Sequence, residues 1–172
     1  MKILLAIIFI IIIVLCYIRF AKPNASNWHV DPELVAQNDL RNSFLNNSKS
    51  GNFSYYAVSI RDLYLKLHEI SEAEKCQRVF GNIDEGLITF VCRSRFWGFP
   101  DYISISFKEH ETGKSSLSVF SRSRFGVYDF GKNKKRMKKW LQQLKSNIDQ
   151  LKLNNLVIYS LIYPPPFAYI LS

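Results

Sequence analysis

The sequence predicts an α+β fold in which a four-stranded antiparallel meander carries helices on one face, behind an N-terminal transmembrane helix. Three observations lead to this prediction. The chain of 172 residues begins with an uninterrupted apolar run, its middle contains short strand-like segments separated by turn signals, and helical periodicity flanks those segments on both sides. A helix, a run of hairpin-connected strands and a second helix together indicate an α+β domain.

The first element is the apolar run from Ile3 to Ile18, which contains no charged residue. As a helix it would rise about 24 Å, slightly less than the ~30 Å hydrocarbon core of a bilayer, and its flanking residues lengthen it. A cleaved signal peptide also begins with a positive charge and an apolar run. However, the segment CYIRFAKP that ends the run is too bulky and too charged for a cleavage site. We therefore expect residues 1–22 to be an uncleaved anchor.

The anchor is followed by a segment of little periodicity, residues 23–54, which is rich in Asn, Ser and Asp. This composition indicates a linker or a segment that hugs the domain surface. We expect the α+β domain to cover residues 55–153. Its first helix begins after Ser59, a good N-cap residue, and presents apolar residues at helical spacing: Ile60, Leu63, Leu67 and Ile70.

Four strands and a second helix complete the predicted domain. The strands are expected over residues 76–81, 86–94, 101–108 and 115–123. The second helix carries one apolar stripe beside Trp140: Met137, Leu141, Leu144, Ile148 and Leu151. Residues 154–172 form an apolar tail, in which Val157 to Tyr163 could form a strand before three prolines end it.

The cysteines and the basic flanks bear on the side of the membrane that holds the domain. Basic residues lie on both sides of the apolar run, so the positive-inside comparison is nearly a tie. If the first two strands form a hairpin centred on Asp84, Cys76 and Cys92 lie opposite each other. A cross-strand disulfide would then be possible and would imply an oxidising compartment. Two buried thiols are the alternative, and the one that an uncertain register favours.

Strand alternation predicts where the side chains of the meander point. The apolar residues of the strands should face the helices, and the serine-rich face should be left open or thinly covered. The second and fourth strands run parallel to each other in a meander, and both end in Arg-Ser-Arg. We therefore expect four arginines to converge at one corner of the polar face, with two aspartates at the same edge: Arg93, Arg95, Arg122 and Arg124, with Asp101 and Asp129.

This arginine corner has two interpretations. In a structural clasp, Asp101 and Asp129 would accept bidentate hydrogen bonds from some of the arginines. In an anion site, the arginines that exceed the aspartates would bind a phosphate or carboxylate. The net charge of +9 and the basic residues that continue from Lys132 to Lys139 favour an anionic partner, since cations are disfavoured at a helix N-terminus. The sequence favours the clasp.

Motifs of known chemistry are missing from the sequence. It contains no Gly-rich phosphate loop, nucleophile elbow or Cys-x-x-Cys motif. His29 and Asp31 could be two metal ligands, but no third ligand is suggested by spacing. We therefore expect no catalytic residue, no metal and no cofactor. Nucleic acid is disfavoured as a partner, because the aromatic residues near the arginines fit a packed turn better in an anchored chain.

Three segments of the chain, NWHVDP, RSRFWGFPDY and SRSRFGVYDFGKNKKR, resemble the signature segments of a bacterial family known as domain of unknown function 1499. The shared pattern is Phe99-Pro100-Asp101, then Ser121 to Asn133, and then Arg136. The resemblance spans roughly residues 28–144. It implies a small domain, often behind a signal or membrane segment, and it implies no activity. The chain departs from the family in its apolar tail and in its extra lysines at 132–139.

These observations together predict a membrane-anchored binding domain rather than an enzyme. We expect a single span in a bacterial inner membrane, with the periplasmic side slightly favoured, and an arginine-rich corner that engages anionic lipid headgroups or an envelope protein. The alternatives are an enzyme acting on an anionic substrate, with Asp101 or Asp129 as acid or base, and a scaffold in an envelope complex. The predicted site residues are Arg93, Arg95, Asp101, Arg122, Arg124, Asp129, Asn133 and Arg136.

Overall fold

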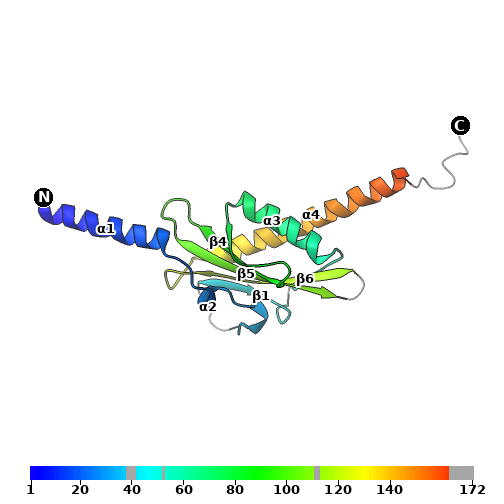
Figure 1. The fold of residues 1–172 in the computed structure, drawn as a ribbon, viewed down its shortest axis with the longest axis horizontal. Helices are drawn as coiled ribbons and strands as arrows, with labels where there is room; N and C mark the ends of the chain where they lie inside the picture. The colour runs from blue at the N-terminus through cyan, green and yellow to red at the C-terminus, as the bar shows by residue number, and fades with distance from the viewer. Residues whose placement is uncertain (38–41, 52, 111–112, 163–172) are drawn as a thin grey trace, which may run out of the picture.

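The computed structural model describes residues 1–172 except 38–41, 52, 111–112 and 163–172, together with the side chains of all described residues but 160 and 161. It shows an antiparallel sheet with two helices on one face and an apolar N-terminal helix that leaves the domain at one end (Figure 1). The predicted α+β class is confirmed.

The elements follow the chain in this order. The helices are α1 (Lys2–Phe20), α2 (Ala25–Trp28), α3 (Ile60–Ala73) and α4 (Lys132–Ile162), with a 3-10 helix, η1, over Pro32–Leu34. The strands are β1 (Ser43–Asn46), β2 (Tyr55–Tyr56), β3 (Gln77–Asn82), β4 (Leu87–Arg93), β5 (Pro100–His110) and β6 (Lys114–Ser123).

The sheet has more strands than the sequence predicted. Strands β3 to β6 form the predicted meander, but the order across the sheet is β1-β6-β5-β4-β3, and β2 also pairs with β6. The prediction of four strands was therefore wrong. The two added strands pair with successive parts of β6, from Ser43 opposite Arg122 to Tyr56 opposite Ser115. They cover an edge of β6 that would otherwise expose unpaired backbone groups.

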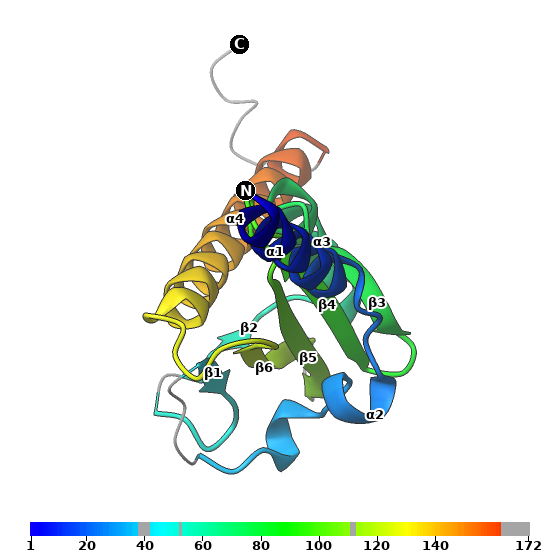
Figure 2. The ribbon, with the colours of Figure 1, turned by 90° about the vertical axis from the view of Figure 1, so that its left-hand side faces the viewer.

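The hydrophobic core lies between the sheet and the two longer helices, α3 and α4, as Figure 2 shows. The Ser59 hydroxyl accepts the backbone N–H of Asp62 and so caps α3, as predicted. Strand residues in one phase, among them Ile88, Ile103 and Val119, are almost fully buried against Leu67 on α3 and a stripe of α4. That stripe consists of Met137, Trp140, Leu144 and Ile148.

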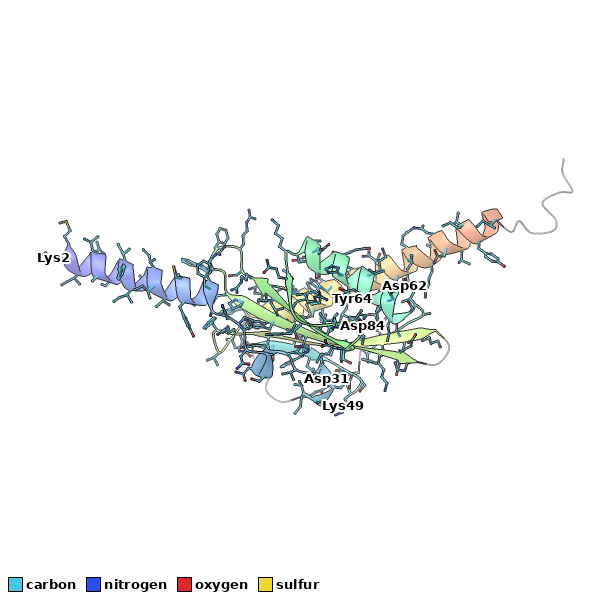
Figure 3. The ribbon with its side chains drawn as sticks, viewed as in Figure 1. Lys2, Asp31, Lys49, Asp62, Tyr64 and Asp84 are labelled. Carbon is cyan, nitrogen blue, oxygen red and sulfur yellow. A yellow bond between two sulfur atoms is a disulfide. The ribbon has the colours of Figure 1, made fainter. Side chains whose placement is uncertain are left out.

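The opposite face of the sheet was expected to be open or thinly covered, and one segment of the chain covers it. The chain from α2 through η1, here called the crossing segment, lies over this face. Asp31 of this segment and Lys49 lie on one side of the sheet, and Asp62 and Tyr64 of α3 lie on the other (Figure 3). The Ser104 hydroxyl donates to the carbonyl of Trp28 (2.9 Å), and the Trp28 ring stacks on Tyr102 with 4.3 Å between centroids. The buried Ser104 hydroxyl thus has a backbone carbonyl of the crossing segment as its hydrogen-bond acceptor.

Helices α1 and α4 extend beyond the domain at opposite ends (Figure 1). Within the described part of the chain, α1 is the one helix long and apolar enough to cross a membrane, a property shared by membrane spans and signal sequences. Helix α4 continues to Ile162, so the suggestion of a strand from Val157 onward was wrong over residues 157–162. The rest of the predicted apolar tail lies outside the described residues.

Cys76 and Cys92 form a disulfide with an S–S distance of 2.02 Å. The hairpin of β3 and β4 has the predicted register next to this bond, with Gln77 opposite Val91 and Arg78 opposite Phe90. A bulge between Arg78 and Phe80 shifts the pairing of the remaining residues by one. The register near the cysteines therefore allows the bond, and the favoured interpretation of two separate buried thiols was wrong.

Candidate functional site

The predicted site residues divide between the two faces of the sheet. Asp101 is in phase with Ile103 and Ile105 on β5, so its side chain faces α4. Arg122 lies opposite Tyr102, in the alternate phase, and faces the crossing segment instead. The four strand-end arginines and the two aspartates therefore do not form the single cluster that the sequence analysis expected.

A buried polar network, here called the helix-side network, joins the strand ends to α4. Its members are Asp101, Ser121, Ser123, Asn133 and Arg136. The Asp101 carboxylate, 2% exposed, accepts hydrogen bonds from the Arg136 guanidinium (2.8 Å) and the Ser123 hydroxyl (2.7 Å), and the Lys132 ammonium lies 3.0 Å away. Two cations thus compensate one buried carboxylate, and Arg136 supplies the charge that the strand arginines were expected to supply.

Asn133 is the centre of the helix-side network and is fully buried. Its side-chain oxygen accepts the Ser121 hydroxyl (2.6 Å), and its amide group donates to the Ser123 hydroxyl (3.0 Å) and to the carbonyl of Asn42 (3.1 Å). This one side chain therefore links β6, the residue before β1 and the first turn of α4. A side chain at this position must supply both a hydrogen-bond donor and a hydrogen-bond acceptor.

Asp129 caps α4 and does not pair with any arginine that the structure describes. Its two carboxylate oxygens accept the backbone N–H groups of Gly131 (2.9 Å) and Asn133 (2.8 Å). A carboxylate at this position satisfies free helix N–H groups and offsets part of the unfavourable charge of the lysines in the first turn. The expected clasp between Asp129 and the arginines was wrong because the helix start is the nearer partner.

On the opposite face, Arg122 and Arg124 hold the residues that follow α1; with Trp28 and Tyr102 they form the anchor clamp. Arg124 Nη1 donates to the carbonyls of Ala21 (3.2 Å) and Lys22 (3.0 Å). The Arg122 guanidinium lies 4.8 Å from the centre of the Trp28 ring and donates to the carbonyl of Asn27. Burial lowers the pKa of the Arg122 guanidinium, which still stays charged at neutral pH.

The other two arginines remain exposed. Arg93 Nη1 donates to the carbonyl of Gly98 in its own turn (3.2 Å). Arg95 makes no hydrogen bond or ion pair with any other residue that the structure describes. Arg95 is thus the only strand-end arginine, among the described residues, with no partner in the fold.

Arg95 belongs to a surface that we call the interfacial corner. It consists of the loop between β4 and β5 and the loop between β6 and α4, which lie side by side next to the end of α1 (Figures 1 and 2). The Phe125 ring contacts Tyr17 of α1 and Phe99, each at 6.3 Å between centroids. Five large side chains of the corner are between 58% and 90% exposed: Phe96, Trp97, Val127, Tyr128 and Phe130.

Sequence reasoning missed Ser121, Ser123, Trp28 and Tyr102. A usable signal existed for the serines, which alternate in phase with Leu117 and Val119 and so had to face the helices. It also existed for Asp101, in phase with Ile103. For Trp28, no local pattern indicates that a residue outside the predicted domain would stack on Tyr102.

The described residues of the site do not form a group typical of a catalytic or metal centre. Over the described ranges, no three His, Cys, Asp or Glu side chains are grouped closely enough to hold a metal ion. Asp101 is buried between cations, and Asp129 is occupied by the helix start. The geometry therefore gives no support to an acid or base role for either aspartate.

A comparison with known families places most of the domain. The model of a family described as "Protein of unknown function (DUF1499)" matches residues 31–144, well over half of the chain. The match contains the whole helix-side network and both arginines of the anchor clamp. No curated protein matches the chain.

Proposed function

The chain belongs to the family described as DUF1499, and on that premise we propose that it is a single-pass membrane protein whose domain rests on anionic lipid headgroups through the interfacial corner. The observation that carries the proposal is the position of this corner. Exposed aromatic side chains, and an arginine with no partner among the described residues, lie in loops next to the point at which the apolar helix α1 joins the domain.

The composition of the corner suits a bilayer interface. Trp and Tyr concentrate at the level of the headgroups, where one part of the ring contacts acyl chains and another contacts water. Trp97 and Tyr128 are exposed on the corner, and Phe96 and Trp97 line a hollow of about 170 Å³ together with Arg19 of α1. In water alone, five large exposed side chains at one end of a domain would be an aggregation hazard.

The charge of the corner suits anionic lipids in particular. Arg93, Arg95, Lys134 and Lys135 are all exposed there or in the adjoining first turn of α4. Each basic residue near an anionic surface contributes about 1 kcal/mol of attraction. Lipid phosphates would also offset the cost of placing lysines at the positive end of the α4 dipole.

The anchor clamp supports a fixed orientation of the domain on the bilayer. Only Ala21 to Asn24 separate α1 from α2, and Arg124 binds the carbonyls of two of these residues. A free linker would let the domain rotate away from the headgroups. A clamped linker keeps the interfacial corner facing the membrane that α1 crosses.

The disulfide supports a placement outside the cytoplasm. Disulfides persist in oxidising compartments and are rare where thiol reductants are abundant, and the bond between Cys76 and Cys92 lies in the core hairpin. We therefore place the domain on the periplasmic side of a bacterial inner membrane, with the N-terminus in the cytoplasm.

The proposal is tested with the full chain in nanodiscs that contain lipids brominated near the headgroup. Trp97 is exposed at the corner, whereas Trp140 is buried, so quenching of tryptophan fluorescence reports the corner. We expect quenching that is stronger in anionic than in zwitterionic nanodiscs and that disappears in Trp97→Phe. Trp140→Phe, a change in the buried core, is the matched control and should keep the quenching. Fluorescence that brominated lipids leave unchanged would overturn the proposal.

A further inference from the structure

We propose that a pocket on the face opposite α3 and α4 binds a small molecule that ends in a carboxylate or a phosphate. This serine pocket has a volume of about 320 Å³. Its polar lining is supplied by β5, β6, η1 and the loop after β1: Ser106, Lys108, His110, Ser116, Ser118, Glu33 and Ser48. The volume lies at the lower end of the range that small-molecule sites occupy, roughly 300–1,000 Å³.

Two hydrogen-bond donors of the pocket have no partner among the residues that the structure describes. Lys108 makes no ion pair, and the Ser106 hydroxyl makes no hydrogen bond, with any residue that the structure describes. Both belong to the same phase of β5, two residues apart, and therefore project from the same face of the strand. An ammonium group and a hydroxyl group side by side provide charge-assisted donors for a single oxyanion.

A hydrogen-bonded pair, His110 and Ser116, lines the pocket together with Lys108 and Ser106. His110 Nε2 and the Ser116 hydroxyl are 2.8 Å apart, and Ser116 lies directly opposite Lys108 in the pairing of β5 with β6. Whichever of the two groups donates in this hydrogen bond, the Ser116 oxygen is held at the wall of the pocket close to the Lys108 strand. The donors from both strands thus converge on one small volume.

Glu33 is the one carboxylate among the described residues of the pocket, and its charge would oppose an anion. Burial raises the pKa of Glu33, but hydrogen bonds from Ser118 and Ser48 and the nearby charge of Lys49 outweigh burial, so the net pKa lies below its ordinary value. The carboxylate is therefore ionised at neutral pH and already satisfied by three hydrogen bonds. Lys49, on the same side of the sheet (Figure 3), offsets its charge and leaves Lys108 uncompensated.

Aromatic rings close another wall of the pocket and specify an organic ligand. Phe53 and Tyr55 meet edge to face with 5.4 Å between centroids, and Tyr55 meets His110 in the same way at 5.0 Å. Rings beside charge-assisted donors suit a ligand with an apolar or aromatic body and an anionic end.

The serine pocket and the interfacial corner lie at opposite ends of β5. Pro100 begins this strand at the corner, and Lys108 and His110 end it at the pocket. The binding proposed here consequently does not depend on contact between the domain and the membrane, and the two proposals fail separately.

The test measures ligand binding to the full chain in detergent micelles by ligand-observed NMR and by the shift in melting temperature. The probes are benzoate and phenyl phosphate, with benzyl alcohol as the neutral probe of similar shape. We expect saturable binding of at least one anion and none of benzyl alcohol. Lys108→Met should weaken the anion about 10- to 100-fold, the usual contribution of a hydrogen bond to a charged group, and Ser106→Ala about 3- to 10-fold.

Lys49→Met is the matched control, because Lys49 lies close to the pocket without lining it. It should change the affinity less than about threefold, as expected for an exposed charge without direct contact. The same effect of Lys49→Met and Lys108→Met would overturn the proposal, and so would the absence of binding by either anion. Binding that survives Lys108→Met but is lost in Arg95→Gln would place the anion at the interfacial corner and would also overturn it.

Discussion

The chain contains the triplet Arg-Ser-Arg twice, and the two copies do different work in the fold. In residues 122–124 both arginines bind the segment after α1, and Ser123 joins the helix-side network. In residues 93–95 the serine hydroxyl accepts the N–H of Phe99 in its own turn (2.9 Å), and the arginines remain exposed.

The cause of this difference lies in the neighbours of each copy. Strand β4 ends at Arg93, so the first copy lies in a turn at the edge of the domain. Strand β6 continues to Ser123 and has α4 on one side and the crossing segment on the other. Two identical triplets therefore differ because only one lies between two layers of structure, and a sequence motif does not by itself assign a role.

The largest expected effect tests whether the second copy depends on a buried charge. Asp101→Ala removes the partner of Ser123 and of Arg136 and leaves a half-buried guanidinium uncompensated. Breaking a buried pair in this way costs about 3–5 kcal/mol in the free energy of unfolding. The measurement is chemical unfolding of the full chain in detergent, with the exposed Asp84→Ala as control. A loss below about 1 kcal/mol would show that the network contributes little.

The two serines provide the most direct comparison of the copies. Ser123→Ala leaves the buried amide of Asn133 and the carboxylate of Asp101 each without one hydrogen bond. We expect it to lower the free energy of unfolding by about 2–3 kcal/mol, and Ser94→Ala by about 1 kcal/mol or less. The reason is that only Ser123→Ala leaves buried polar groups without a hydrogen-bond partner. Equal losses in the two variants would remove the distinction between the copies.

A smaller effect is expected from the arginines. Arg124→Gln should loosen the segment after α1, because it removes a charged donor to the carbonyls of Ala21 and Lys22. Hydrogen exchange of the backbone N–H of Trp28 and His29 should rise about five-fold, which corresponds to about 1 kcal/mol of local stability. Arg95→Gln, the equivalent change in the first copy, should leave this exchange unchanged. Unaltered exchange in Arg124→Gln would argue against the anchor clamp.

The smallest change in stability is expected at Arg95. Arg95→Gln should alter the free energy of unfolding by no more than about 0.5 kcal/mol, since the side chain has no partner among the described residues. The same substitution should nevertheless weaken the quenching of Trp97 in anionic nanodiscs. A variant that is destabilised but still quenched would assign Arg95 to the fold and not to the membrane.

The sequence predicted the fold well where local patterns control it. Period-two alternation correctly separated Leu117 and Val119 from Ser118 and Arg122, and the register beside the cysteines was also correct. The added strands could not be predicted, because Ser43–Asn46 is short and takes its structure from the unpaired edge of β6. Tertiary pairing of this kind leaves no periodicity in the segment itself.

The site was less predictable than the fold for a related reason. The partners of Asp101 and Arg124 come from α4 and from the linker, which are distant in sequence. Applying the alternation rule to Asp101 would have placed it toward α4, but the identity of Arg136 as its partner depends on how the helix packs. The contacts of an arginine with backbone carbonyls have no sequence signature at all.

Helix α4 also determines a length. It begins at the interfacial corner, runs along the sheet and continues past it for a total of 31 residues, or about 46 Å (Figure 1). If the corner rests on the headgroups, the C-terminal end of α4 at Ile162 lies away from the bilayer, at a distance that the length of the helix sets. The protein would then function as a spacer of fixed reach, which presents its far end at a set height above the membrane that holds α1.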